Sequence, residues 1–117
     1  MRIPFHGEVD SADASAATGV AFTLYLDGAT VAYTLQEHDH VLMTDYSISP
    51  EVAMTVKIIG ATDAAGVRPV DRYCAATGGA DRALETPYLF PKGVTPRLYG
   101  SVADYVKATI HGEIIQA

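Results

Sequence analysis

Apolar and polar residues alternate with a period of two along much of the chain. The alternation is clearest over residues 20–26 and 31–35, where every second side chain is apolar. Side chains two positions apart in a β-strand lie on the same face, so this pattern predicts half-buried strands. Asp27-Gly28 stands between the two segments, and an Asp-Gly pair in this position is a strong hairpin signal. We therefore expect a hairpin over residues 20–35.

Further strand patterns cover residues 41–48, 54–59, 67–75 and 102–115. In the first of them, a regular strand would put two sets of side chains on opposite faces. One set is Leu42, Thr44, Tyr46 and Ile48, and the other is Val41, Met43 and Asp45. Short strands that follow one another at intervals of about 8–12 residues are typical of sandwiches and jelly rolls. We predict an all-β fold, a single antiparallel β-sandwich or jelly roll of about 7–9 short strands.

The chain divides into an N-terminal segment and a sandwich domain. Residues 1–19 are expected to form an N-terminal arm or an edge strand, the latter over residues 3–9, followed by a small, polar, flexible linker. Residues 20–117 form the predicted β-sandwich domain. Within it, prolines and a glycine interrupt residues 86–96, which are expected to run as an extended excursion anchored by aromatic and leucine side chains.

Composition limits the class of protein. A chain of 117 residues, 49% of them hydrophobic, is long enough for one domain with a core. Eight basic and fourteen acidic residues give a net charge of −6, which disfavours nucleic acid and anionic membrane surfaces as partners. No apolar run approaches the roughly 18 residues of a membrane span, and residues 1–5 lack the apolar core of a signal peptide, so we expect synthesis in the cytoplasm. The single cysteine, Cys74, excludes an intramolecular disulfide and is expected to be a small buried residue.

One stretch has the residue types of a metal site. His38 and His40 lie two residues apart between carboxylates and would share a face in a strand. With Asp45 beyond them, they resemble part of the first motif of the cupins, metal-binding jelly rolls in which a His-x-His pair precedes an acidic ligand. Asp45 is an odd number of residues from His40, so only a β-bulge would bring it to the same face. Ala32 stands where that motif has a glycine, and Pro96 stands where the second cupin motif has its histidine.

We interpret the segment around these two histidines as an exposed polar turn that leads into the strand. No residue is therefore assigned a catalytic or cofactor-binding role, no cofactor is expected, and His38 and His40 remain the metal candidates. A cupin-like metal-binding protein or enzyme that uses them stays as an alternative. His6 and His111, each two residues before a glutamate, alternate along possible strands and are interpreted as ordinary solvated positions.

The seven tyrosines, in a chain without tryptophan, offer another interpretation. Aromatic side chains on one face could line a sugar-binding surface, so a carbohydrate-binding β-sandwich module is a second alternative. Most of the tyrosines fall within strand patterns, where packing in the core or at a subunit boundary explains them more simply.

Six segments follow one another along the chain in an order that is similar to that of a known kind of protein. They are residues 41–49, 52–59, 73–79, 86–87, 92–96 and 107–114. Their order resembles small bacteriophage head-decoration, or cement, proteins with jelly-roll or tumour-necrosis-factor-like folds. Such proteins form trimers on the outside of a capsid and clamp neighbouring subunits without enzymatic activity. The resemblance therefore implies a structural, non-enzymatic virion protein that binds the outer capsid surface and stabilises the head.

The resemblance also implies partners and a location. We expect a homo-oligomer, a trimer in such families, bound to the major capsid protein on the virion surface after assembly in the host cytoplasm. Decoration needs an extended segment that reaches a neighbour, for example by adding a strand to the edge of its sheet. The candidate partner-binding residues come from the N-terminal and the proline-rich segments and are Ile3, Phe5, Tyr88, Leu89, Phe90 and Pro91. Neither nucleic acid nor a membrane is expected as a partner.

Overall fold

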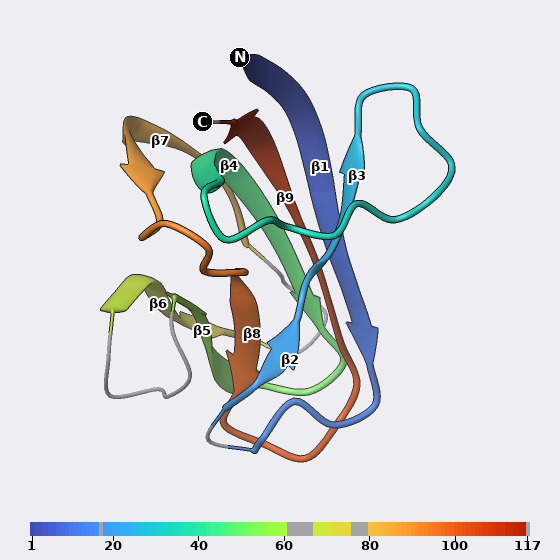
Figure 1. The fold of residues 1–117 in the computed structure, drawn as a ribbon. Coiled ribbons are helices and arrows are strands. Elements are labelled where there is room, and N and C mark those ends of the chain that lie inside the picture. The colour runs from blue at the N-terminus through green and yellow to red at the C-terminus, as the bar shows by residue number, and fades with distance from the viewer. Residues whose placement is uncertain (17, 61–66, 76–79, 117) are drawn as a thin grey trace.

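The computed structural model describes residues 1–16, 18–60, 67–75 and 80–116. Within these residues the chain forms nine β-strands and no helix (Figure 1). In chain order the strands are β1 (Arg2–Ser11), β2 (Val20–Ala21), β3 (Thr23–Leu26), β4 (His40–Pro50), β5 (Met54–Gly60), β6 (Val67–Cys74), β7 (Ala80–Leu89), β8 (Arg97–Gly100) and β9 (Val106–Ile115). The described part accordingly has no helix that could cross a membrane. Residues 76–79, which belong to the segments that resemble decoration proteins, lie outside the described residues.

The strands form two antiparallel sheets that pack together (Figure 1). The five-stranded sheet has the order β3-β1-β9-β4-β7, and the four-stranded sheet has the order β2-β8-β5-β6. The pairing of β1 with β9 runs the full length of both strands, from Arg2 opposite Ile115 to Ser11 opposite Val106. The predicted all-β antiparallel sandwich is therefore confirmed.

The core lies between the two sheets and is built from alternating strand positions. In β9, for example, Val106, Ala108 and Ile110 are buried, whereas Lys107 and His111 are exposed. The largest fully buried side chains come from both sheets and from the segment after β7: Phe90, Met43, Ile48, Met54, Ile58, Ile59, Leu98, Ile110, Ile114, Val41, Val56 and Val106. Full burial of one such side chain contributes about 1.5–3 kcal/mol, so the core fixes which face of each strand turns inward.

β1 is an interior strand, with β3 on one side and β9 on the other. The expectation of an edge strand over residues 3–9 is therefore wrong. Phe5, Gly7 and Val9 face the core along this strand. Because β1 pairs on both sides, its backbone groups are satisfied within the sheet while these residues cover the core.

The expected hairpin over residues 20–35 does not form. Its first half is divided between the two sheets, because β2 pairs with β8 and β3 pairs with β1. Residues 31–35 contribute only an isolated bridge, between Tyr33 and Leu24. The Asp-Gly pair instead begins an exposed loop, residues 27–32. The local turn signal is overridden because β3 finds its partner in a strand that is distant in sequence.

A β-bulge interrupts β4 at Thr44. Met43 lies opposite Gly112 of β9 and Asp45 lies opposite His111, so Thr44 is the extra residue. Before the bulge the odd-numbered residues of β4 are buried, and after it the even-numbered residues are buried. The prediction that the even-numbered residues 42–48 share one face of this strand, and the odd-numbered residues 41–45 the other, is therefore wrong. The inserted residue reverses the alternation at the bulge.

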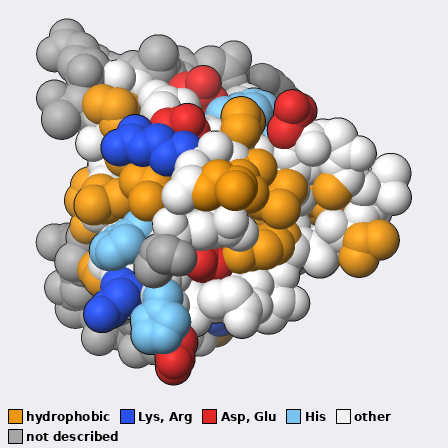
Figure 2. All heavy atoms as spheres, turned by 45° about the horizontal axis from the view of Figure 1, so that its top comes forward, with side chains coloured by type: hydrophobic (Ala, Val, Ile, Leu, Met, Phe, Trp, Pro, Cys, Tyr) orange, Lys and Arg blue, Asp and Glu red, His pale blue; other side chains and the backbone are white. Residues whose placement is uncertain are grey.

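Hydrophobic side chains gather at the end of the molecule that holds both termini (Figure 2). The strand register defines this end, because Arg2 of β1 and His40 of β4 both lie opposite Ile115 of β9. Met1 is 82% exposed there, and Leu89, at the same end of β7, is 48% exposed. We refer to this region as the terminal end.

Candidate functional site

Four polar or aromatic side chains form a row across the outer face of the five-stranded sheet. His6 of β1 lies directly opposite Tyr25 of β3 on one side and opposite His111 of β9 on the other. His111 in turn lies opposite Asp45 of β4. Phe5, next to His6 in the chain, is buried, so the alternation of the strand directs the row away from the core. We refer to Tyr25, His6, His111 and Asp45 as the histidine row.

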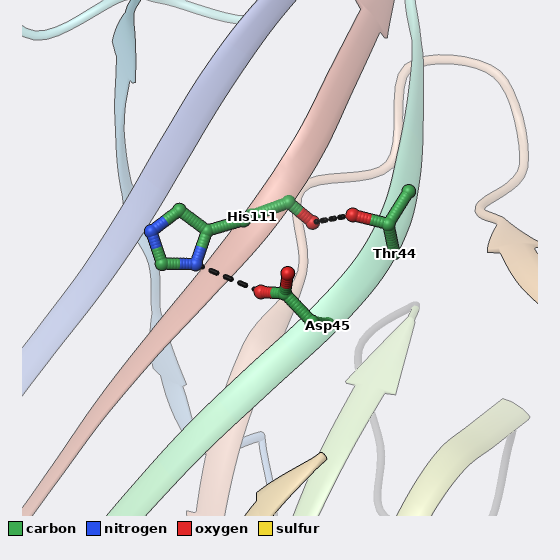
Figure 3. A network of polar contacts seen from close by, with 3 residues as sticks. All are labelled: Thr44, Asp45 and His111. Atoms are coloured by element: carbon green, nitrogen blue, oxygen red, sulfur yellow. Dashed lines mark hydrogen bonds and ion pairs between the residues drawn. The ribbon is translucent and has the colours of Figure 1, made fainter. Parts of the chain in front are cut away.

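A hydrogen bond joins the two residues at one end of the row (Figure 3). Nδ1–H of His111 donates to Oδ1 of Asp45 at 2.8 Å, and both side chains are about half exposed. Because a carboxylate only accepts hydrogen bonds, Nδ1 carries the proton and Nε2 of the neutral ring keeps its lone pair. Nε2 lies on the side of the ring away from Asp45, toward β1 (Figure 3). Asp45 thus orients the imidazole and leaves Nε2 available as a base or as a ligand.

The other histidine of the row is held by an aromatic ring. The rings of His6 and Tyr25 stack with their centroids 5.2 Å apart and an angle of 17° between their planes. The rings of His6 and His111 are 6.4 Å apart and tilted by 39°. The row therefore places two imidazoles on adjacent strands, each with a partner on its outer side.

The bulge in β4 brings Asp45 into the row. In a strand without the extra residue, Asp45 would share the face of the buried Met43 and would point into the core. Thr44 also bonds across the bulge, because its Oγ1 donates to the carbonyl oxygen of His111 at 3.2 Å (Figure 3). Bulges are common next to functional sites because they redirect a side chain in this way.

An open groove of about 400 Å³ lies beside the row. It is lined by Pro4, Phe5, His6, Asp27, Thr44, His111, Gly112 and Glu113. Two imidazoles and two carboxylates therefore share this lining. Arg2 contacts one of the carboxylates, with Nη1 3.4 Å from Oε1 of Glu113. Because carboxylates repel anions, the groove favours a cation or a neutral molecule.

The two histidines singled out in the sequence have separate partners. His38 lies in an exposed turn, with Nε2 3.2 Å from the carboxylate of the preceding glutamate. His40 begins β4, and its Nδ1 is 2.9 Å from the carbonyl oxygen of Phe90. Asp45 does reach the outer face through a bulge, but its partner is His111. In the part of the chain that the structure describes, no group of three or more His, Cys, Asp or Glu side chains could hold a metal ion.

Between these histidines lies a buried acid, Asp39, which is only 4% exposed. Its carboxylate accepts hydrogen bonds from the hydroxyl of Tyr33 and, at 3.0 Å, from the backbone N–H of Gln36. Its carbonyl oxygen accepts from the N–H of Gly93 at 2.8 Å, which attaches the loop after β7. Burial, with the bond to Asp39, raises the pKa of Tyr33. The segment that resembles a cupin motif therefore connects the loop before β4 with the loop after β7.

The residues expected to contact a partner divide between interior and surface. The buried and half-buried members are Ile3, Phe5, Tyr88 and Phe90. The exposed members are Leu89 and Pro91. Buried side chains supply stability rather than contact area, and of the six residues Leu89 and Pro91 are the most accessible.

The tyrosines are spread over different parts of the molecule. Tyr25 stands in the histidine row, Tyr46 is buried in the core, and Tyr73 is exposed on β6 of the other sheet. Tyr33 is half-buried and belongs to the Asp39 network. These four side chains do not share a face, so they form no continuous surface on which sugar rings could stack.

Cys74 is a buried free thiol at the end of β6. Burial raises the pKa of this thiol, and the charge of Arg72 opposes that effect in part. A thiol that stays protonated is a weak nucleophile and a weak metal ligand. The expectation of a small buried residue at this position is confirmed.

No protein-family model, no curated protein and no solved structure matches the chain significantly. The fold alone therefore defines the class, an antiparallel β-sandwich, and the histidine row is the candidate site on it.

Proposed function

We propose that the protein is a structural, non-enzymatic virion protein that binds the outer surface of a capsid and stabilises the head as a homo-oligomer. The class of function comes from the order of segments, which resembles that of bacteriophage decoration proteins. The fold is compatible with it, because two closely packed sheets form a rigid body that can hold neighbouring subunits in place. The apolar surface at the terminal end is the observation that carries the proposal.

The terminal end combines side chains from several strands. Met1 and Leu89 are exposed there, and Leu42 lies directly opposite Leu89 in the register of β4 and β7. The loop at residues 27–32 starts from the same end, because its first N–H donates to the carbonyl oxygen of Pro4 at 2.9 Å. Apolar groups that share one end of a molecule favour contact with another protein surface.

The loop at residues 27–32 extends this surface beyond the sheet (Figure 1). After Asp27 it consists of glycine, alanine, threonine, valine and alanine, and all of them are exposed. Val31 is 77% exposed. A solvated loop usually carries charged or polar groups, whereas full burial of a valine at an interface contributes about 1.5–3 kcal/mol. The loop is therefore suited to reach a neighbouring subunit.

We assign the terminal end to contacts between copies of this chain and propose the trimer that is usual in decoration families. Each copy carries a net charge of −6, so copies repel one another at long range. An apolar contact has to overcome that repulsion, and salt screens it. The oligomer should therefore become more stable as the salt concentration rises. The assembled oligomer then binds the major capsid protein.

The test is the mass of the purified full chain by light scattering, from about 0.05 M to about 0.5 M NaCl, followed by sedimentation with capsids. We expect a trimer whose population increases with salt and which sediments with capsids built from a bacteriophage major capsid protein. Leu89→Asp should dissociate the trimer. The matched control is Val102→Asp, an exposed apolar position before the start of β9 at the opposite end, and it should leave the trimer intact. A chain that stays monomeric at every salt concentration and does not sediment with capsids overturns the proposal.

A further inference from the structure

The histidine row contains two imidazoles that are placed to share a ligand. His6 and His111 are direct neighbours across β1 and β9, and side chains in such pairs have Cβ atoms about 4.5–5.5 Å apart. Their ring centroids are 6.4 Å apart. With metal–nitrogen bonds of about 2.0–2.1 Å, two imidazoles on one ion have ring centres about 4.5–6.4 Å apart, depending on the angle between the two bonds. The observed separation lies at the upper limit of this range, and since both rings lie on the outer face, rotation of the side chains can bring them closer.

Asp45 prepares one of these imidazoles as a metal ligand. Its hydrogen bond of 2.8 Å to Nδ1–H of His111 leaves the lone pair on Nε2, the nitrogen that faces β1 (Figure 3). A metal-bound histidine almost always donates its other N–H to a carboxylate, a carbonyl or water, which fixes the ring and makes the ligating nitrogen more basic. On the other side, stacking against Tyr25 holds the ring of His6.

The groove beside the row favours a cation. Asp27 and Glu113 line it together with the two imidazoles, so an anion would meet two negative charges. Imidazole ligands suit Cu²⁺, Ni²⁺ and Zn²⁺, whereas Mg²⁺ and Ca²⁺ prefer oxygen ligands. Glu113 already contacts Arg2, at 3.4 Å, and is not counted among the ligands.

We propose that His6 and His111 bind one divalent transition-metal ion in this groove, Cu²⁺ most tightly and Ni²⁺ and Zn²⁺ more weakly, with Asp45 as a positioning residue. Because the described residues offer no group of three or more ligands, water fills the remaining positions and the ion exchanges readily. The site does not depend on the proposed assembly, since its residues differ from the apolar residues of the terminal end.

The test uses the full chain without a histidine tag and Cu²⁺ as the probe. Calorimetry measures stoichiometry and affinity, and electron paramagnetic resonance counts the nitrogen ligands. We expect one ion per chain with two nitrogen ligands. His6→Gln and His111→Gln should each weaken binding by about 100-fold or more, and Asp45→Asn by about 10- to 100-fold. The matched controls, His38→Gln and His40→Gln, should bind as the unchanged chain does.

Asp45→Asn has a second readout that a merely structural role would not change. In the metal-free chain, the nitrogen chemical shifts of His111 report which ring nitrogen carries the proton. They should move from the Nδ1–H form toward a mixture of tautomers, while circular dichroism shows an unchanged fold. The proposal is overturned if the unchanged chain takes up no Cu²⁺, or if His6→Gln and His111→Gln bind it as tightly. Loss of binding only in the His38 and His40 variants overturns it as well.

Discussion

Replacing Gly112 by alanine tests whether the bulge in β4 determines the geometry of the five-stranded sheet. A Cβ at this position would lie 1.8 Å from the carbonyl oxygen of Leu42 and 2.9 Å from its carbonyl carbon, although Cβ atoms essentially never approach other atoms within 3.0 Å. The obstacle is backbone and cannot rotate away as a side chain would. β4 and β9 must therefore separate locally by about 1 Å or more, which lengthens the ladder hydrogen bonds on both sides of the bulge.

The expected cost follows from what the separation breaks. Overpacking of a well-packed interior costs about 1–3 kcal/mol. Each backbone hydrogen bond that is lost adds about 0.5–1.5 kcal/mol. With about two such bonds lost, we expect Gly112→Ala to lower the free energy of unfolding by about 2–6 kcal/mol. Domains of this size have about 5–15 kcal/mol in total, so the melting temperature should fall by about 8–25 °C.

Urea unfolding followed by circular dichroism measures this loss, with Gly28→Ala as the matched control. Gly28 has a φ of +77° and no atom within 4 Å of an added Cβ, so alanine there meets backbone strain without a clash. That strain costs about 1–2 kcal/mol. If Gly112→Ala costs no more than Gly28→Ala, the strands separate freely at the bulge and the reasoning is refuted.

Two further predictions concern titratable groups, the half-buried Tyr33 and the buried Cys74. Burial and the bond to Asp39 raise the pKa of Tyr33. Its hydroxyl therefore stabilises the fold fully below the tyrosine pKa of the unfolded chain, about 10. This stabilisation is lost as pH rises through the higher pKa of the folded chain. Tyr33→Phe should lower the free energy of unfolding by about 1–3 kcal/mol at neutral pH. Urea titrations above about pH 10 should show a smaller difference in stability from the unchanged chain. A difference that does not vary with pH would contradict the stabilising role of the Tyr33 hydroxyl. Cys74 is buried and its pKa is raised by that burial, so a thiol reagent should label it only as rising urea unfolds the chain, and fast labelling without urea would show that the thiol is accessible.

Alternation along the chain is sufficient to predict the all-β class, because a period of two between apolar positions is a property of the local sequence. The pairing of strands is not local. β1 pairs with β9 from the other end of the chain, and β3 pairs with β1 rather than with residues 31–35. The sequence does not predict β7 as a strand, because it contains Pro87 and proline is not expected inside a hydrogen-bonded ladder. In the structure the register with β4 jumps from Tyr88 to Ala83, so Pro87 falls within the shift.

The histidine row could not be predicted from spacing, because its four residues come from four strands. A local signal for the bulge does exist, since the apolar positions change from odd to even between Met43 and Tyr46. An insertion at this point turns Asp45 outward, which a regular strand does not. Its partner His111 lies 66 residues further along the chain, and only the pairing of β4 with β9 brings the two together. Alone in its segment, His111 therefore looks like an ordinary solvated residue.

The bulge and the glycine opposite it restrict β4 and β9 to one alignment. A regular antiparallel pair keeps its inward faces when one strand slides by two residues, so misaligned pairs can be nearly as stable as the correct one. In this pair, a slide would place a residue with a side chain against the carbonyl group of Leu42, where an added Cβ finds no room. Misaligned intermediates are thereby penalised while the sheet assembles, which widens the energy gap that favours the native pairing. Thr44 and Gly112, which place no large side chain in the core, thus contribute to the accuracy of folding.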